Sequence, residues 1–372
     1  MSSRSVTGAT TAAGRPAEPA GPRQQQDRYT QQYTQLMRQV KQSGLLRRRY
    51  CYYWTKMSLT VLALAGTGLA MVLVGDSWFQ LILAGVLAVV FAQLAFLGHD
   101  AAHRQIFRSG TANEWAGLVH GTLLGGLSAG WWQNKHTRHH ANPNKLGADP
   151  DIATSVIAFT ADARAQRGPI GRYLADRQGW FFFPLLLVEG LNLHVGSVQR
   201  VVGRAPMKRR GWEIAFLTVR LVGYLVLLLI LMSPEIVVAF VGIQLAVYGL
   251  YLGAAFAPNH TGMPIVPADL RIDFLQRQVL MSRNVTGGWF IHFLLGGLNY
   301  QIEHHLFPSM PRPNLRRVQP LVRRACADNN VAYTEKPLGT AYTIVLRYLN
   351  DVGLAGRTQF SCPLAVQLRA PK

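Results

Sequence analysis

Four apolar runs, each long enough to cross a lipid bilayer, limit the folds open to this chain. A helix of about 20 residues spans the ~30 Å hydrocarbon core of a membrane. The runs cover residues 57–75, 78–97, 212–232 and 236–257. Two residues separate the first pair and three separate the second, so each pair predicts a tight helical hairpin. The sequence therefore predicts an all-α integral membrane protein with four transmembrane helices in two hairpins.

The distribution of basic residues predicts which side of the membrane the loops occupy. The chain has 38 Lys and Arg against 18 Asp and Glu, a net charge of +20. Ten basic residues precede residue 57, 14 lie in 98–211, 13 follow residue 257, and neither hairpin turn has any. Two hairpins place these regions on one side, which the positive charge identifies as cytoplasmic. We therefore predict a multi-pass protein of a bacterial cytoplasmic membrane, with both termini inside.

The same charge bears on the binding partners. Basic loops beside a bilayer suit anionic lipid headgroups and phosphate-bearing substrates, so the net charge does not require a nucleic acid partner. Arg220 is the one basic residue inside an apolar run. We expect its side chain to reach the membrane surface or to pair with a carboxylate.

The remaining segments are polar or only weakly apolar. The stretches 115–132 and 180–198 contain His together with Gly or Glu, and we expect them to be interfacial or re-entrant helices. Residues near the N-terminus are rich in Ser, Ala, Gly, Pro and Gln, a composition typical of disorder. The expected organisation is a disordered arm (1–28), a basic surface helix (29–56), a membrane domain with a cytoplasmic helical cap (57–329) and a cytoplasmic tail (330–372).

Eight of the 11 histidines lie in four short motifs. Residues at positions i, i+3 and i+4 of a helix share one face, so the imidazoles within a motif are expected to point the same way. All four motifs fall on the side predicted to be cytoplasmic. The motifs are His99 with His103; His136 with His139 and His140; Asn259 with His260; and Gln301 with His304 and His305.

Imidazoles clustered at this spacing predict a metal site. Neutral imidazole binds iron, zinc, copper and nickel, and a zinc ion takes only three or four ligands, so eight histidines imply two metal ions. The three cysteines are far apart, which excludes a thiolate site. His194 is the best further ligand candidate, whereas His120 and His292 are expected to be hydrogen-bonded core residues. The carboxylates expected to orient ligand rings are Asp100, Asp149, Asp151 and Glu303.

These motifs resemble those of the integral-membrane fatty acid desaturase family. The match covers roughly residues 56–329 and rests on the three histidine boxes in order, the third within the segment GGLNYQIEHHLFP at 296–308. The third box begins with Gln301, and in this respect it resembles the third box of the front-end branch of the family and its bacterial relatives. The two hairpins agree with the resemblance.

The resemblance implies a centre of two non-haem iron ions that uses O2 to introduce a cis double bond into an acyl chain, carried by coenzyme A or by a lipid. Gln301 stands where many relatives have His, and it would bind iron weakly, hold a water or orient His305. Asn259 lies beside a further ligand position. The ligands carried over from the family are His99, His103, His136, His139, His140, His260, His304 and His305.

The source of electrons is a separate question. Members of the front-end branch often carry a fused cytochrome with a His-Pro-Gly-Gly motif, and no His in this chain is followed by Pro. We therefore expect a separate electron donor, such as a ferredoxin with an NAD(P)H-dependent reductase. An acidic carrier of this kind would dock on basic residues. The candidates are Arg312, Arg316, Arg317, Arg323 and Arg324.

The acyl chain is expected to lie in an apolar tunnel, and two other functions stay open. Trp131 and Trp132 are candidates to line the tunnel, and Lys135 and Arg138 are candidates to contact coenzyme A. The same centre in a hydroxylase of fatty acids, alkanes or carotenoids would yield an alcohol. A metal transporter or sensor would instead hold its ligands at mid-bilayer, where the apolar runs have almost no ionisable residues.

Overall fold

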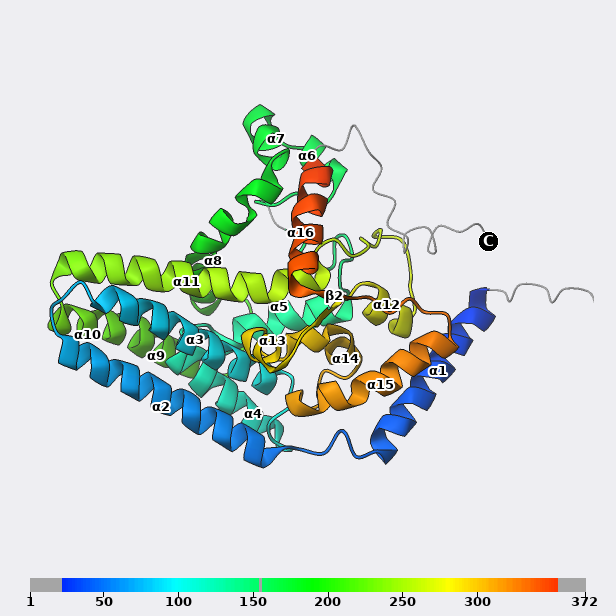
Figure 1. Cartoon of the computed structure of the whole chain (residues 1–372), viewed down its shortest axis with the longest axis horizontal. Helices are drawn as coiled ribbons and strands as arrows, with labels where there is room; N and C mark the ends of the chain where they lie inside the picture. The colour runs from blue at the N-terminus through cyan, green and yellow to red at the C-terminus, as the bar shows by residue number, and fades with distance from the viewer. Residues whose placement is uncertain (1–21, 154–155, 354–372) are drawn as a thin grey trace, which may run out of the picture.

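Long apolar helices form a bundle, and shorter helices gather at one of its ends (Figure 1). The structure is a computed structural model that describes residues 22–153 and 156–353. Within these residues, five helices are long and apolar enough to cross a membrane. Four of them correspond to the predicted runs. The five are α2 (Tyr50–Val74), α3 (Gln80–Ala102), α8 (Gln178–Val202), the composite helix of α9 (Arg210–Thr218), η2 (Val219–Gly223) and α10 (Tyr224–Leu231), and α11 (Pro234–His260).

Two of these helices continue past their apolar runs and carry histidines on their ends. α3 reaches Ala102 and includes His99, and α11 ends at His260. α11 begins with Pro234 in its first turn, where the missing N–H of proline costs nothing. The histidines at these ends are therefore held by rigid helix backbone rather than by loops.

The two hairpin turns touch each other at the opposite end of the bundle (Figure 1). The backbone N–H of Ser233 donates to the Asp76 carboxylate at 2.7 Å. Gln80 fixes the first turn from within, since its amide donates to the carbonyls of Met71 and Gly75. The hairpins therefore point in the same direction.

Arg220 is buried inside the bundle, and the expectation for its side chain is wrong. Its guanidinium lies 4.2 Å from the ring centroids of both Phe91 and Tyr224. Its Nε donates to the Leu124 carbonyl at 3.1 Å. Two aromatic faces and one carbonyl thus stabilise the buried charge, and no carboxylate among the described residues pairs with it.

α8 crosses α11 at a pair of glycines. A Cβ on Gly249 would lie 2.2 Å from the backbone N of Gly190, whereas a Cβ on Gly242 of the same helix meets nothing within 4 Å. We expect Gly249→Ala to force the helices apart and to lower stability by about 1–3 kcal/mol, and Gly242→Ala to be neutral or slightly stabilising. Thermal unfolding of both variants in detergent measures the difference. Equal midpoints for the two variants would contradict this close packing.

Shorter helices cover the histidine-bearing end of the bundle. The stretch 115–132, expected to be interfacial or re-entrant, lies in two helical segments separated at residues 125–128. Ser128 caps the second segment by accepting from the N–H of Trp131. A small parallel pair of strands joins two distant segments. The elements are α4 (Gly110–Ala116), the π-helix η1 (Gly117–Leu124), α5 (Ala129–Ala141), α6 (Ala161–Ala165), α7 (Pro169–Ala175), α12 (Phe274–Leu280), β1 (Asn284–Thr286), α13 (Trp289–Leu294), η3 (Leu298–Tyr300), α14 (Gln301–Leu306), α15 (Arg312–Asp328) and β2 (Glu335–Pro337).

The segments expected at the two ends of the chain differ from the structure. α1 (Pro22–Gln42) begins inside the expected arm, whose first 21 residues lie outside the described part. Residues 330–353, expected as a tail, form β2 and α16 (Leu338–Gly353), and residues 354–372 are not described. α16 packs against α8 and α11, where Val345 and Leu349 are buried in a cluster with Phe182. An amphipathic helix packed in this way is part of the folded domain.

Candidate metal centre

Eight histidines from four separate segments converge at one end of the bundle. The end of α3 supplies two, α5 three, the end of α11 one and α14 two. In α5 and α14 the i, i+3 and i+4 spacing puts the rings on one face, as expected. The converging residues are His99, His103, His136, His139, His140, His260, His304 and His305.

The rings form two groups that meet at His140. In the first group, nitrogens of His99, His103, His136 and His304 all lie within 4.8 Å of one another, and in the second the same holds for His139, His260 and His305. His140 has its Nε2 3.1 Å from Nε2 of His136 and its ring stacked on His305 at 4.1 Å. Two ion-sized sites side by side fit this arrangement.

The outer nitrogens of several rings are hydrogen-bonded, which aims their Nε2 atoms inward. Nδ1 of His139 lies 3.0 Å from the Asp149 carboxylate, and Asp151 lies 3.3 Å away on the same side. Nδ1 of His260 donates to the Met281 carbonyl at 2.9 Å. The other two outer contacts are Nδ1 of His99 to the Asp100 carboxylate at 3.4 Å and Nδ1 of His305 to the side-chain amide oxygen of Gln278 at 2.9 Å.

The inward nitrogens fit a cation. Nε2 of His139 and Nε2 of His260 face each other at 3.2 Å, although Nδ1 of each ring already bonds an acceptor. Two lone pairs at this distance need a positive charge between them, from a proton or a metal ion. Nε2 of His103, His304 and His305 is buried without a hydrogen-bond partner among the described residues. Such a set of orphaned nitrogen donors suits metal ions.

The electrostatics favour neutral imidazoles in most of the cluster. Burial lowers the pKa of five ring systems well below the usual value for histidine, and neighbouring imidazoles lower it further. These five are His103, His136, His140, His304 and His305. Burial acts in the same direction on His139, but Asp151 and Asp149 outweigh it, so the pKa of His139 is raised. Neutral imidazole is the form that binds metals.

Gln301 contacts His260 of the second group rather than His305. Its amide nitrogen is 2.8 Å from Nε2 of His260, and its Oε1 is buried with no hydrogen-bond partner in the described part of the chain. Rotation of the amide by 180° would turn the oxygen toward the ring nitrogens. The residue that orients His305 is Gln278 of α12, which no motif in the sequence marks.

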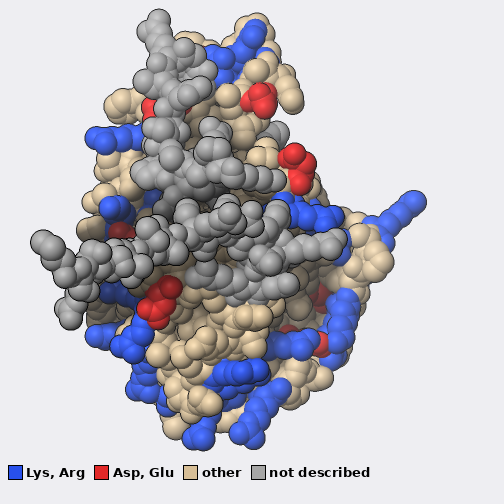
Figure 2. Space-filling view, turned by 90° about the vertical axis from the view of Figure 1, so that its right-hand side faces the viewer, with Lys and Arg blue, Asp and Glu red and all other residues tan. Residues whose placement is uncertain are grey.

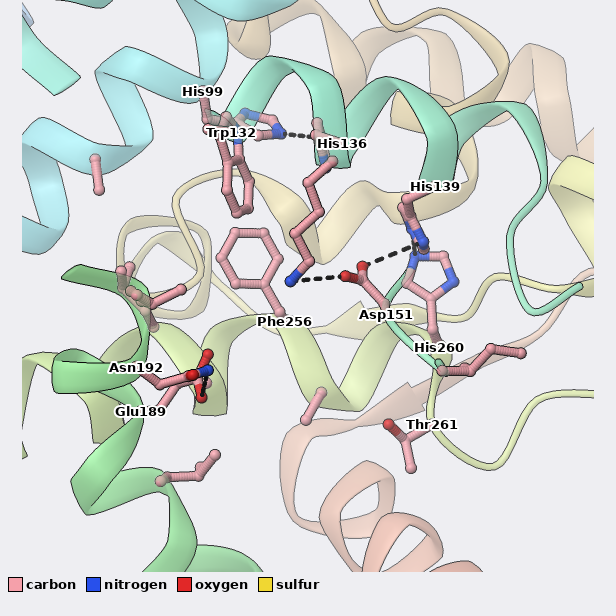
Figure 3. A pocket seen from close by; sticks show the side chains of 18 of the residues that line it. His99, Trp132, His136, His139, Asp151, Glu189, Asn192, Phe256, His260 and Thr261 are labelled. Atoms are coloured by element: carbon pink, nitrogen blue, oxygen red, sulfur yellow. Dashed lines mark hydrogen bonds and ion pairs between the residues drawn. The ribbon is translucent and has the colours of Figure 1, made fainter. Parts of the chain in front are cut away.

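A cavity of about 300 Å³ opens beside the histidines and runs between α8, α11 and α16 (Figure 3). Trp132, stacked on His136 at 4.9 Å, and Phe256 form its wall near the cluster. Leu186 and Tyr348 lie along it farther away. Most of the lining is apolar, with two polar pairs, Lys135 with Asp151 at 3.0 Å and Glu189 with Asn192 at 3.0 Å. The cavity suits a long apolar ligand whose chain passes the histidines.

Two residues predicted near the metals, His194 and Glu303, lie elsewhere or face away. His194 bonds the Gly190 carbonyl and packs on Tyr248, outside both histidine groups. The Glu303 carboxylate bonds Asn284 and Tyr333, each at 2.7 Å, and burial raises its pKa to about 7. A helical residue adjacent to His304 points about 100° away from it, which explains the error for Glu303.

Asn259, His120 and His292 each form a hydrogen bond outside the histidine cluster. Asn259 donates to the Ala255 carbonyl one turn back in its own helix, and its Oδ1 is buried with no hydrogen-bond partner among the described residues. His120 bonds the Ala116 carbonyl, and His292 bonds Asn299. The expectation that the last two are hydrogen-bonded core residues agrees with these contacts.

Of the residues predicted to contact the substrate or the electron donor, some lie where expected and others do not. Trp132 and Lys135 line the cavity, whereas Trp131 packs on Gly196 of α8 and Arg138 lines a different cavity. Arg312 is not a surface residue. It is buried, and its Nη2 lies 2.6 Å from Asp100, because the backbone turn after the third histidine motif directs α15 back toward α3.

Comparison with known proteins matches residues 76–337 to the model of the family described as fatty acid desaturase. The chain is 27% identical to a Delta(8)-fatty-acid desaturase of Helianthus annuus over 76% of this chain and 64% of that one. It is 32% identical to fatty acid desaturase 3 of Bos taurus over 76% and 63%, and 29% identical to the Delta(6)-fatty-acid desaturase fat-3 of Caenorhabditis elegans over 88% and 76%. It thus spans less than two thirds of the first two relatives. The chain is an integral membrane protein that belongs to the fatty acid desaturase family.

Proposed function

We propose that this protein is an O2-dependent fatty acyl desaturase, an oxidoreductase that introduces a cis double bond into an acyl chain carried by coenzyme A or by a lipid. One observation carries the proposal: eight histidines converge, and four of them, His99, His136, His139 and His260, line an apolar cavity that reaches the cluster from between the helices. Family membership supports the same activity.

Two non-haem iron ions are the proposed cofactors. The first group of histidines would hold one ion and the second group the other, with His140 between them and Gln301 at an open place in the second. The bound irons would activate O2, the oxidant needed to break an unactivated C–H bond. A donor set of imidazoles without thiolate suits this metal.

The chain's own side chains would position the reaction. Trp132 and Phe256 confine the acyl chain next to His99 and His136, so that one pair of methylene groups faces the metals. The apolar lining excludes water from the reacting carbons. Asp149 and Asp100 hold His139 and His99 in the tautomer whose Nε2 faces inward.

The proposed topology has four spans, with the histidines and the helical cap on the cytoplasmic side. The α5 histidines precede α8 in the chain, and His260 follows α11, yet His139 and His260 lie 3.2 Å apart. An even number of crossings must therefore separate them. α9–α10 and α11 supply two, so α8 lies along the cap instead of crossing, despite its sufficient length.

The face at the histidine-bearing end supports this orientation. Figure 2 shows more Lys and Arg than Asp and Glu on that face, as expected for a cytoplasmic surface. Arg316, Arg317 and Arg324 of α15 are exposed there. They would dock a separate acidic electron donor such as a ferredoxin with its NAD(P)H-dependent reductase.

The experiment that tests the function is product analysis. The chain would be expressed with a ferredoxin and its reductase in a heterologous host, and the fatty acids would be identified by gas chromatography–mass spectrometry after derivatisation of double bonds. We expect a new cis-unsaturated acid with the double bond at one position. A hydroxylated acid would indicate the related oxygenase chemistry instead. No product from iron-loaded protein with a working donor would contradict the proposal.

A further inference from the structure

A second cavity, of about 370 Å³, lies on the face of α5 opposite the histidines. Residues 133, 134, 137 and 138 of α5 line it, whereas residues 132, 135, 136 and 139 line the first cavity. The helical period of 3.6 residues puts these two sets on opposite faces. The ends of α3 and α8, the helices α4 and η1, and the loop before α9 complete its lining. Among its lining residues, Arg138 is the one that the sequence predicts to contact coenzyme A.

The side chains that line this cavity carry more positive than negative charge. Its two carboxylates are already engaged: Glu114 pairs with Lys208 and Arg209, and Glu213 accepts from the backbone N–H of Gly130 at 2.8 Å. Three further arginines line the cavity from three different segments, and none has a carboxylate partner among the described residues. These are Arg104 after α3, Arg138 on α5 and Arg200 on α8.

Arg200 is only partly satisfied. Its Nη2 donates to the Pro206 carbonyl at 2.9 Å, but its Nε is buried and has no hydrogen-bond partner in the described part of the chain. A buried donor of this kind costs free energy unless a ligand accepts from it. Arg104 follows α3 at a positive φ of 56°, the left-handed position of a helix-ending turn in which the N–H of Gln105 donates to the Asp100 carbonyl at 2.9 Å, and its side chain is exposed. The buried Nε of Arg200 is therefore the feature that indicates a missing acceptor.

The tryptophans near this cavity indicate that it lies at the depth of the lipid headgroups. Trp115 and Trp212, each next in sequence to a carboxylate that lines the cavity, pack edge to face with ring centroids 5.3 Å apart, and the Arg209 guanidinium lies 5.0 Å from the Trp115 ring. Tryptophans of this kind are enriched where a membrane meets water. Gly98, Gly117 and Ala129 line both cavities, so only small residues separate this space from the metal-side cavity.

We propose that this cavity binds a phosphate ester. Guanidinium groups match phosphate oxygens in planar, bidentate geometry, and several unpaired ones around one space favour a ligand with more than one anionic oxygen. The phosphate would belong either to a phospholipid headgroup or to coenzyme A. The binding itself does not depend on the proposed desaturation, which enters only through the cytoplasmic placement of the cavity.

Calorimetric titration of the full chain, iron-loaded and in a nonionic detergent, tests the site. The probes are free coenzyme A and a short-chain phosphatidylglycerol, each at low and high salt. We expect at least one probe to bind, more weakly at high salt. Arg104→Gln and Arg200→Gln should each lower its affinity by about tenfold or more. The probe that binds identifies the source of the phosphate, and binding of both would indicate a site that recognises phosphate alone.

Arg204→Gln is the matched control, because Arg204 is exposed in the same loop and does not line the cavity. Its affinity should equal that of the unchanged chain. Binding of neither probe, or equal losses in all three variants, would overturn the proposal. Unfolding midpoints and iron content show that each variant is folded, and exposed Arg104 still tests the site if Arg200→Gln does not fold. Because no turnover is measured, failure of the desaturase proposal would leave this result unaffected.

Discussion

Replacing His139 by alanine is expected to abolish product formation and to release one metal ion. Its Nε2 is one of three imidazole nitrogens in the second histidine group, so the variant keeps only those of His260 and His305. Loss of an outer hydrogen bond to a ligand already costs about 10–100-fold in metal affinity or activity, so loss of the ligand should cost more. Metal analysis of the purified variant and the fatty acid assay measure both effects.

His292→Ala is the matched control for this substitution. His292 lies in α13, bonds Asn299 and belongs to neither histidine group. We expect this variant to keep its metal and its product. A His139→Ala protein with full metal content and unchanged product would exclude the assignment of that residue as a ligand. Equal losses in both variants would point to general destabilisation.

Arg312→Gln is expected to lower both stability and metal affinity, although Arg312 touches no metal ligand. Its guanidinium lies 2.6 Å from Asp100, which in turn contacts Nδ1 of His99, and it also donates to the Phe96 carbonyl. Both charged side chains are almost completely buried. Removing one partner of a buried ion pair leaves an uncompensated charge and costs about 3–5 kcal/mol. Thermal unfolding and competition with a metal chelator measure the two effects.

Further variants separate positioning of His99 from general packing. Asp100→Asn in the Arg312→Gln background removes the unpaired charge and should recover part of the stability, but not the metal affinity, because His99 then lacks its carboxylate. Arg312→Lys should be intermediate. Arg316→Gln, one turn along α15 and exposed, should have no effect. A normal chelator midpoint for Arg312→Gln would show that the ion pair serves stability alone.

The apolar runs and the histidine ligand candidates can be predicted from the sequence, because each is marked by a pattern among residues that are close together in the chain. An apolar run of about 20 residues has few alternatives to a membrane helix, and spacing of three and four residues fixes a helix face. The contacts that orient the rings depend on distant segments instead. Gln278 and the Met281 carbonyl carry no local signal, and Arg312 resembles its exposed neighbours on α15 until the fold buries it against Asp100.

The errors have similar causes. Glu303 is adjacent to a ligand in sequence but points away from it on the helix. The C-terminal segment, expected to be a tail, lies outside the part of the chain that resembles the family, and its apolar residues are spaced along one helix face without forming a long run. α16 buries that face against α8. Arg220 lacked an obvious partner because aromatic faces, unlike carboxylates, do not stand out in a sequence as partners for a cation.

The convergence of distant segments on one centre has a consequence for biosynthesis. His139 meets a ring 121 residues later in the chain, and Tyr53 contacts the backbone of Arg312 across 259 residues. The ribosome must therefore synthesise the chain beyond His305 before all eight imidazoles are present. Until then the early helices lie in the membrane without the later helices that pack against them. A metal ion can then enter only a nearly finished molecule, which it stabilises by mass action. If the metal is the proposed iron, cells short of iron should accumulate less of this protein through faster degradation of the metal-free form.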